Sequence, residues 1–465
     1  FLFDYWMYGV NPSGWHLTSL CLFVVNVLLL FLLIKRMTRQ WPEANSDAMS
    51  FFSSALFAVS PLHGETVYWI SARADLLSGA FYLTSFLLAV TSFQDKKKNL
   101  LYLSAVCFFL ALLSKETGIL LPIALAAYFY LFPEEHSFKA GLTNEVSEGI
   151  ESTKKTRKQV HNEKVLFKKH KKRKTKTRTN RETSTETEVE ITPVHVTVKE
   201  RLLRSLRSSA PLATVAVLYL VIRYFSLGTV LGGYSGIMGS GVFENLFLRP
   251  RDLAVMERII CSIPESVDSI TRLPRWAILF SLFICLSMAI VRLFVKKFPG
   301  RYLIFLLIWS GTCLLPIICF WRVGENLQSS RLLFFCSMAS IIIPPLLLFF
   351  PFNPHSTSKK NNIIILVQRC TGSLVCLTMI VTHAWVLFIN SQYWLAAGFE
   401  LENIMRRSVE IALKTPANQK TVLLDLPAFN EGGQILINGS QFAHLLRPPF
   451  TKADYSEKLV TFSPF

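Results

Sequence analysis

Ten apolar segments, separated by polar stretches of very different length, dominate the chain. A helix needs about 20 predominantly apolar residues to cross the hydrocarbon layer of a membrane, or about 17 at the short end. Six segments reach that length, and four would have to borrow flanking residues. We therefore predict an all-α polytopic membrane protein with about ten spans. The segments are residues 16–34, 49–62, 76–93, 100–113, 118–132, 210–225, 276–295, 302–321, 332–352 and 363–389.

Composition agrees with the segment pattern. Of the 465 residues 51% are hydrophobic, and a soluble domain would not place so many in long runs. The nine cysteines stand mostly inside the apolar segments and show no metal-ligand spacing, so we expect neither a disulfide framework nor a metal site. The chain opens on Phe1 within an apolar stretch and shows no signal-peptide pattern, and we expect a preceding segment.

Lysine and arginine gather in alternate connections, and such basic loops stay in the cytoplasm. With ten spans they all fall on one face: Lys35-Arg36, 96–98, 154–181, 296–297 and 359–360. The opposite, non-cytoplasmic face then carries residues 1–15, 63–75, 114–117, 226–275, 321–331 and everything after 390.

A long polar region divides the spans into two groups. Residues 134–207 are rich in Lys, Arg, Thr and Glu and nearly free of aromatics, so we predict a disordered cytoplasmic insertion. Residues 164–181 hold ten Lys or Arg and no acid. In a soluble protein this run would suggest nucleic-acid binding. Between spans the nearer partner for the basic loop 154–181 is anionic lipid, and we expect no nucleic acid. The spans on either side are residues 1–133, with a motif loop at 61–77, and residues 208–390.

Residues 391–465 follow the last span, and we predict a small α+β cap on the non-cytoplasmic face. Residues 401–413 have a helical pattern. KTVLLDLPAF and GGQILINGSQFAHLL suggest two short strands joined by a glycine turn. Asn438-Gly439-Ser440 fits the N-glycosylation acceptor pattern, which applies if this is an endoplasmic reticulum protein.

Four polar clusters fall on the predicted non-cytoplasmic face. They are PLHGETVYWISARADLL at 61–77, SKET at 114–117, Arg223 and RVGENLQSSR at 322–331. Each charge could snorkel or pair to lock a helix end. Ionisable groups at span ends also face cavities, and Arg and Lys donate to phosphate. Four mixed-charge clusters on one face therefore favour a site for an anionic lipid-linked substrate.

The spacing within the motif loop suggests further groupings. If residues 64–75 form one short helix, Glu65, Trp69 and Arg73 share a face. Trp69 is then either an interfacial aromatic or a stacking surface for a sugar or a lipid headgroup. The adjacent Lys115 and Glu116 either end a helix or belong to the site.

These stretches resemble a known family. PLHGETVYWISARADLLSGAFYL and ALLSKETGILLPIAL are similar to the membrane part of the transmembrane-and-tetratricopeptide mannosyltransferases and their bacterial relatives, in the C-type glycosyltransferase superfamily. The pattern HPxHxExVxWIxxRxDLL is matched except that Ser60 replaces the first His, and LLSKExGxxLP is matched. FDYWMYGVNPSGWHLTSL also resembles the family, at Asp4 among other positions. GENLQSSRLLFFCSMA is loosely similar to a later ER-YLPS element. The resemblance covers about residues 1–350 without the insertion.

The resemblance implies transfer of one sugar, a mannose-like hexose, from a polyprenyl- or dolichyl-phosphate carrier to an acceptor protein or glycan. The catalytic face would be lumenal in the endoplasmic reticulum membrane or periplasmic in a bacterial inner membrane. The lipid-linked sugar is the donor substrate, and no other cofactor is implied. A carboxylate base belongs in the first non-cytoplasmic loop, which we expect upstream of Phe1.

The resemblance also implies roles for residues in this chain. Candidates for the lipid phosphate are Arg73, Lys115, Arg223 and Arg331. Candidates for the acceptor, or for orienting the site, are His63, Glu65 and Asp75. Further site candidates are Trp69, Glu116 and Glu325. We expect Arg73→Ala to weaken use of the lipid-linked sugar without unfolding the protein.

Two alternatives remain open at this point. A lipid or solute transporter would show inverted repeats and ionisable groups near the midplane. A noncatalytic scaffold would keep the fold without the base. The tail has no room for three tetratricopeptide repeats of about 34 residues, so the acceptor could be something other than a protein.

Overall fold

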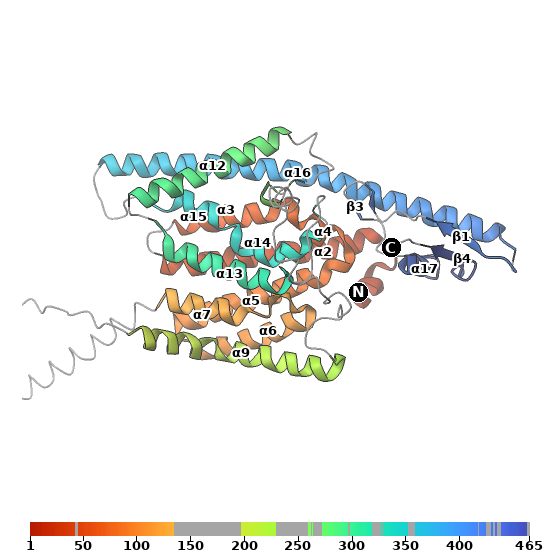
Figure 1. Cartoon of the computed structure of the whole chain (residues 1–465), viewed down its shortest axis with the longest axis horizontal. Coiled ribbons are helices and arrows are strands. Elements are labelled where there is room, and N and C mark those ends of the chain that lie inside the picture. The colour runs from red at the N-terminus through yellow and green to blue at the C-terminus, as the bar shows by residue number, and fades with distance from the viewer. Residues whose placement is uncertain are drawn as a thin grey trace, which may run out of the picture.

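The fold is a bundle of long helices with a small cap beyond one end (Figure 1). This computed structural model describes residues 1–41, 45–133, 197–228, 259–261, 263, 272–295, 298–318, 327, 329–351, 359–416, 418–424, 429–430, 433–434 and 439–462. Phe1 lies at the same end of the bundle as the cap, and we call this end the cap end.

The first group of elements precedes the predicted insertion. It comprises α1 (Leu2–Tyr8), α2 (Pro12–Met37), η1 (Thr38–Gln40), α3 (Ser46–Val59), η2 (Pro61–His63), α4 (Gly64–Tyr68), η3 (Ile70–Ala72), α5 (Arg73–Asp95), α6 (Lys98–Ser114), η4 (Glu116–Gly118) and α7 (Leu121–Leu131).

The second group follows the insertion. Its helices are α9 (Val198–Leu227), α12 (Arg272–Phe294), α13 (Gly300–Ile318), η6 (Ser330–Leu333), α14 (Phe334–Ser340), α15 (Ile343–Phe349), α16 (Lys359–Lys414) and α17 (Gly439–Leu445). Its strands are β1 (Thr421–Leu424), β2 (Phe429–Asn430), β3 (Gly433–Gln434) and β4 (Leu459–Phe462).

Local sequence explains where several helices begin and end. The Asn11 side chain accepts a hydrogen bond from the Ser13 backbone at the start of α2. Thr197 and Glu200 form a reciprocal capping box at the start of α9, and Gly228 ends that helix in the left-handed conformation. The capping box starts α9 well before residue 210, so this helix includes the last part of the predicted insertion.

Seven helical stretches are long and apolar enough to cross a membrane. They are Pro12–Gln40, Ile70–Asp95, Val198–Leu227, Arg272–Phe294, Gly300–Ile317, Ser330–Phe349 and Ile363–Lys414. Three shorter apolar stretches are Ser46–Val59, Lys98–Ser114 and Glu116–Leu131. Each of the ten predicted segments overlaps one of these stretches. The helical, membrane-type architecture agrees with the prediction, and the number of crossings stays a prediction.

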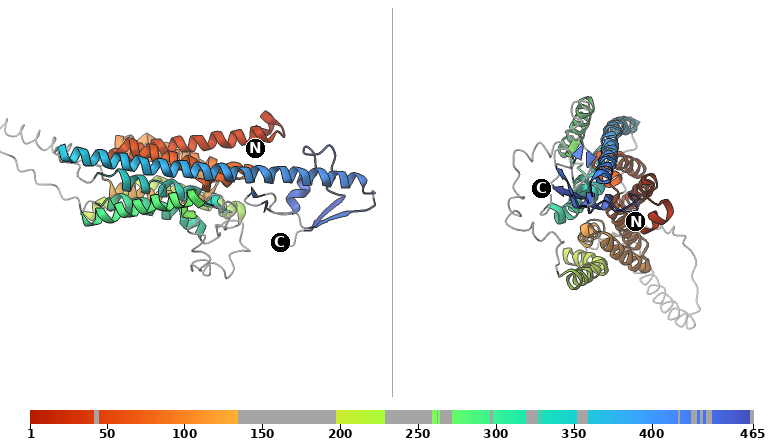
Figure 2. Two further views of the ribbon diagram at one scale, coloured as in Figure 1. Left: turned by 90° about the horizontal axis from the view of Figure 1, so that it is seen from above. Right: turned by 90° about the vertical axis from the view of Figure 1, so that its right-hand side faces the viewer.

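The helices pack through apolar side chains and a few buried hydroxyls. Ser78, Ser85 and Ser92 recur every seven residues along α5, and each donates to a backbone carbonyl of α6 or the connection beside it. Such small polar residues let helices approach closely inside a membrane. Figure 2, seen from the cap end, places α9 and α12 at the periphery, where most of their apolar windows remain exposed.

The end opposite the cap carries two of the predicted basic connections. Arg36 pairs with Asp95, which joins the end of α2 to the end of α5. Lys35 lies 3.3 Å from Asp47 at the start of α3. The helix α16 begins at this same end and runs the length of the bundle (Figure 1). Residues 134–196 of the predicted insertion, which include the basic loop 154–181, and the basic pair at 296–297 lie outside the described residues.

The cap differs in detail from its predicted form. The predicted helix at 401–413 is the last part of α16, whose 56 residues extend beyond the bundle. The short strands β2 and β3 pair in antiparallel fashion on either side of residues 431–432, and these two residues of the predicted glycine turn lie outside the described residues. However, β1 pairs in parallel with β4 near the end of the chain, so the predicted strand pairing was wrong for β1. A small core of Ala397, Ala412, Phe442, Leu446 and Leu459 holds these pieces on α16.

Candidate active site at the cap end

The motif loop does not form one helix. The helix α4 ends at Tyr68, Trp69 has extended backbone angles, and a short turn leads into α5 at Arg73. The expectation that Glu65, Trp69 and Arg73 share a helical face was therefore wrong. The break sends Glu65 and Trp69 toward one partner and Arg73 toward another, which creates two separate arginine clusters.

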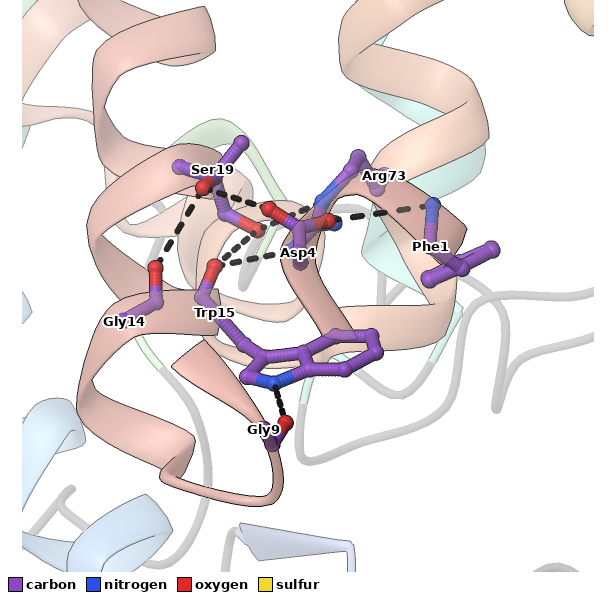
Figure 3. A network of polar contacts seen from close by, with 8 residues as sticks. Phe1, Asp4, Gly9, Gly14, Trp15, Ser19 and Arg73 are labelled. Atoms are coloured by element: carbon purple, nitrogen blue, oxygen red, sulfur yellow. Dashed lines mark hydrogen bonds and ion pairs between the residues drawn. The ribbon is translucent and has the colours of Figure 1, made fainter. Parts of the chain in front are cut away.

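The first cluster surrounds Arg73 (Figure 3), and every nitrogen of its guanidinium has a partner. Arg73 pairs with the buried carboxylate of Asp4, donates to the Trp15 carbonyl at 2.7 Å, and lies 3.4 Å from the Ser19 hydroxyl. Thr18 donates to the other oxygen of Asp4 at 2.7 Å. These contacts fasten α1 and α2 to the first turn of α5.

Aromatic rings cover the same guanidinium. Its central carbon lies 5.2 Å from the centre of the Phe1 ring and 5.6 Å from the Trp15 ring. Only 8% of the Arg73 side chain is exposed. A buried arginine with a buried carboxylate partner is typical of a fixed structural contact, because separating the two would leave an unpaired buried charge. Asp4 was not among the predicted site residues, although it matches the family pattern.

The second cluster joins the motif loop to η6. The Arg331 backbone N–H donates to Glu65 Oε2 at 3.3 Å, and Arg331 Nε lies 3.8 Å from Glu65 Oε1. The guanidinium carbon lies 4.0 Å from the centre of the Trp69 ring. These contacts bring together residues that are more than 260 positions apart in the chain. Two of the four polar clusters that were predicted to lie on one face of the membrane are therefore in contact.

Arg331 differs from Arg73 in what its guanidinium leaves free. Among the residues that the structure describes, none of its guanidinium nitrogens has a hydrogen-bond partner: the buried Nε contacts Glu65 only as an ion pair, and Nη1 and Nη2 remain available. The side chain is 22% exposed. A guanidinium held by its Nε side and its flat face therefore presents an unoccupied pair of donors, which is the geometry that binds phosphate oxygens end-on.

Two further ion pairs extend this region. Lys115 Nζ lies 2.5 Å from Asp75 Oδ1, and its side chain keeps 25% of its surface exposed. Arg223 Nη2 lies 3.3 Å from the half-exposed Glu116. Together with the two arginine clusters, these pairs join four acids to four cations, and we call the set the cap-end pairs.

The protonation of Glu65 depends on this surrounding charge. Burial raises the pKa of Glu65 above its ordinary value of 4.5, while Arg331 acts in the opposite direction through its charge and its backbone hydrogen bond. Asp75 and Lys115 also act on Glu65 through space, in opposing directions. The pKa of Glu65 therefore shifts when a new charge, such as a phosphate, binds beside Arg331.

His63 lies in the core rather than beside these charges. Its Nδ1 donates to the Phe57 carbonyl at 2.8 Å, and its Nε2 lies 2.8 Å from the Ser337 hydroxyl. Burial lowers the pKa of His63 to about 3, so the ring is neutral at neutral pH. Three Phe rings surround it, at positions 23, 57 and 334. This arrangement ties the motif loop to α3 and α14 and gives His63 no charge with which to attract phosphate.

The helix α16 supplies contacts that the sequence did not reveal. The Tyr68 hydroxyl hydrogen-bonds with Ser391, and burial raises its pKa to about 12. The Tyr68 and Trp394 rings lie 6.1 Å apart. A side chain at Gly64 would meet Asn390 at 2.8 Å, so glycine permits the close approach of α4 to α16. The motif loop is therefore braced by the helix that carries the cap.

Two predicted features cannot be placed. Glu325, and most of the loop 322–331 before Ser329, lie outside the described residues. Within the described ranges, no group of three or more His, Cys, Asp or Glu side chains is arranged to hold a metal ion.

Comparisons with known proteins point to one family. The sequence model of the dolichyl-phosphate-mannose-protein mannosyltransferase family matches residues 7–143. Protein O-mannosyl-transferase Tmtc3 of Drosophila melanogaster is 32% identical over 140 residues, which are 26% of this chain and 15% of that protein. Tmtc1 of the same fly is 33% identical over 119 residues, 26% of this chain and 13% of that protein.

A third relative comes from a nematode. Protein O-mannosyl-transferase F38B6.6 of Caenorhabditis elegans is 31% identical over 130 residues, 28% of this chain and 18% of that protein. The aligned part thus spans less than a fifth of each of these relatives, and no solved structure matches. The family match begins at residue 7, after Asp4, and includes the motif loop and the SKET turn. These contribute Glu65, Trp69, Arg73, Asp75, Lys115 and Glu116 to the cap-end site. The resemblance predicted from the motifs is confirmed over residues 7–143, and this part of the chain is related to the C-type membrane glycosyltransferases.

Proposed function

We propose that this chain contains the membrane part of a glycosyltransferase that moves a mannose-like hexose from a polyprenyl- or dolichyl-phosphate carrier to an acceptor. The reaction would take place at the cap end, on the lumenal or periplasmic face of the membrane. One observation carries the proposal: the family motif residues Glu65 and Trp69 hold Arg331 with its two terminal donors free.

The charge balance of the site limits how it can bind an anion. The four described cap-end pairs contain as many acids as cations, so these pairs by themselves carry no net positive charge that would attract the phosphate. Affinity must instead come from individual donors that remain available. Arg331 offers its Nη groups, and Lys115 offers the N–H bonds that its contact with Asp75 leaves over. We assign the phosphate to these two residues and give Arg73 a structural role.

The proposed step is a single displacement at the anomeric carbon. The acceptor oxygen attacks C1 of the sugar, and the bond between C1 and the phosphate oxygen breaks, with its electron pair going to the phosphate. The acceptor proton goes to the carboxylate base that the family resemblance implies. Arg331 and Lys115 would hold the phosphate equally in the bound carrier and in the transition state, so that their contribution appears in donor binding.

The first test is donor turnover by the full-length gene product. It would be incubated in lipid nanodiscs with radiolabelled polyprenyl-phosphate mannose and, separately, polyprenyl-phosphate glucose. We expect turnover of the mannose carrier, lost in Arg331→Ala. A folded wild-type protein that neither binds nor turns over either carrier would contradict the proposal.

The acceptor class needs a separate assay. The relatives are protein O-mannosyl-transferases by name, which supports serine- or threonine-containing peptides as the first acceptors to try. Transfer of label to such a peptide would assign a protein acceptor. Transfer to a glycan alone would leave the enzyme class intact and reject a protein acceptor.

A further inference from the structure

Arg331 is held in place on two sides before any ligand arrives. Glu65 contacts the Nε side of the guanidinium and the backbone N–H of the same residue. The Trp69 ring lies under the flat face, with its centre 4.0 Å from the guanidinium carbon. Tryptophan gives the strongest cation–π contact of the aromatic residues, and it favours a cation placed over its face.

The backbone on both sides of Trp69 fixes the position of its ring under the Arg331 guanidinium. The residue stands at the break between α4 and η3, with extended φ and ψ of −89° and 108°. Its N–H closes α4 on the Glu65 carbonyl at 3.1 Å, and its carbonyl accepts from Ala72 at 2.9 Å. Both neighbouring turns therefore fix Trp69 relative to Glu65, and through Glu65 to Arg331.

A free arginine side chain would have to give up rotamer freedom when it grips a phosphate. Here that freedom is already restricted, so less of the binding free energy is lost to ordering. We propose, building on the function proposed above, that Trp69 is a positioning residue for donor binding. It holds the Arg331 guanidinium in one plane, with Nη1 and Nη2 directed at the phosphodiester of the lipid-linked sugar.

The neighbouring aromatics do not compete for this role. Phe1 and Trp15 cover Arg73, whose nitrogens are all engaged. Trp394 packs against Tyr68. Among the described residues, Trp69 is the one aromatic ring recorded against Arg331.

The test measures KM for polyprenyl-phosphate mannose, kcat, and equilibrium binding of polyprenyl phosphate, with full-length protein in nanodiscs. We expect Trp69→Leu to raise KM about tenfold and to weaken binding equally, with kcat within about twofold. Trp69→Phe keeps an aromatic face and should recover most of the loss. Trp385→Leu removes an exposed indole of α16 and should leave both constants unchanged.

A double-mutant cycle separates positioning from general damage. Arg331→Lys keeps the charge but removes the planar fork, so Trp69→Leu in that background should add less than about twofold. An equal loss in both backgrounds, or a fall in kcat with KM unchanged, would overturn the positioning role. If Trp69→Leu does not fold, Trp69→Met decides, because it also removes the ring, and an unchanged KM in that variant also overturns the role.

The outcomes also separate this inference from the proposed function. Wild-type protein that binds no polyprenyl phosphate would reject both. Wild-type binding that is lost in Arg331→Ala but unchanged in Trp69→Leu would keep the proposed function and reject the inference alone.

Discussion

Two arginine clusters at the cap end use the same residue types in opposite ways. Around Arg73, a buried carboxylate, a carbonyl and a hydroxyl engage all three nitrogens beneath two aromatic rings. Around Arg331, a carboxylate and one ring hold the guanidinium and leave two nitrogens unengaged among the described residues. The comparison teaches that a cation in a family motif can be structural or ligand-binding, and that its unused donors distinguish the two.

The largest expected effect comes from removing Arg73, whose guanidinium nitrogens all have partners. Arg73→Ala leaves the buried Asp4 without its guanidinium partner and should reduce the free energy of unfolding by about 3–5 kcal/mol. Thermal unfolding in detergent would measure it. This prediction differs from the one formed from sequence, that the variant stays folded, and the same measurement decides between them. The double variant Asp4→Leu/Arg73→Met removes both charges and should recover most of the loss. If it is as unstable as Arg73→Ala, unpaired charge is the wrong explanation.

Removing Arg331 should weaken the binding of polyprenyl phosphate more than it lowers the stability of the fold. Arg331→Ala removes two charge-assisted donors and should weaken binding of polyprenyl phosphate roughly 100-fold. Equilibrium binding to protein in nanodiscs would measure this. Arg223→Ala serves as the comparison, because that arginine is engaged by Glu116 and by the Tyr219 hydroxyl. Equal losses in the two variants would show that the number of free donors does not decide the phosphate ligand.

A smaller effect should appear as a pH dependence. Burial raises the folded-state pKa of Glu65 above 4.5, so the folded protein binds this proton more tightly than the unfolded chain. Stability from this group is present below pH 4.5 and is lost as pH rises through the raised pKa. Glu65→Gln should therefore gain stability relative to wild type as pH rises above 4.5.

Melting temperatures measured from pH 4.5 to 8 would show this divergence. Glu116→Gln provides a matched loss of a carboxylate at the same end, at a half-exposed position. If the melting temperatures of Glu65→Gln and wild type differ by the same amount at every pH in this range, titration of Glu65 does not contribute to stability.

The smallest effect is expected at the opposite end of the bundle. Lys35 and Asp47 form an ion pair with side chains 48% and 84% exposed, so Lys35→Ala should change the free energy of unfolding by less than about 1 kcal/mol. Unfolding at low and high salt would measure it. A loss comparable with that of Arg73→Ala would show that burial does not separate the two ends.

Much of the architecture could be predicted because it depends on local apolar runs. All ten apolar segments and the gathering of the motif residues at one end follow from hydropathy and charge. The break at Trp69 could not be predicted, because Arg331, more than 260 residues away, holds that ring. The parallel pairing of β1 with β4 likewise depends on a chain return that short-range patterns do not encode.

The partner of each arginine could not be predicted from the sequence either. Arg73 and Arg331 both stand near acids in the sequence, and spacing alone ranks them alike as phosphate ligands. Only the folded chain brings Asp4 to Arg73, across 69 positions, and so removes it from competition. A motif residue with a stated chemistry therefore needs its tertiary partner before its role can be assigned.

The uninterrupted α16 also sets a length scale. At 1.5 Å per residue its 56 residues span about 84 Å, against a hydrocarbon layer of about 30 Å. From Ser391, where it meets Tyr68, to Lys414 the helix runs about 35 Å. This length fixes the distance between the motif loop and the far tip of the cap. A peptide bound at that tip could reach the motif loop only through an extended stretch of about ten residues.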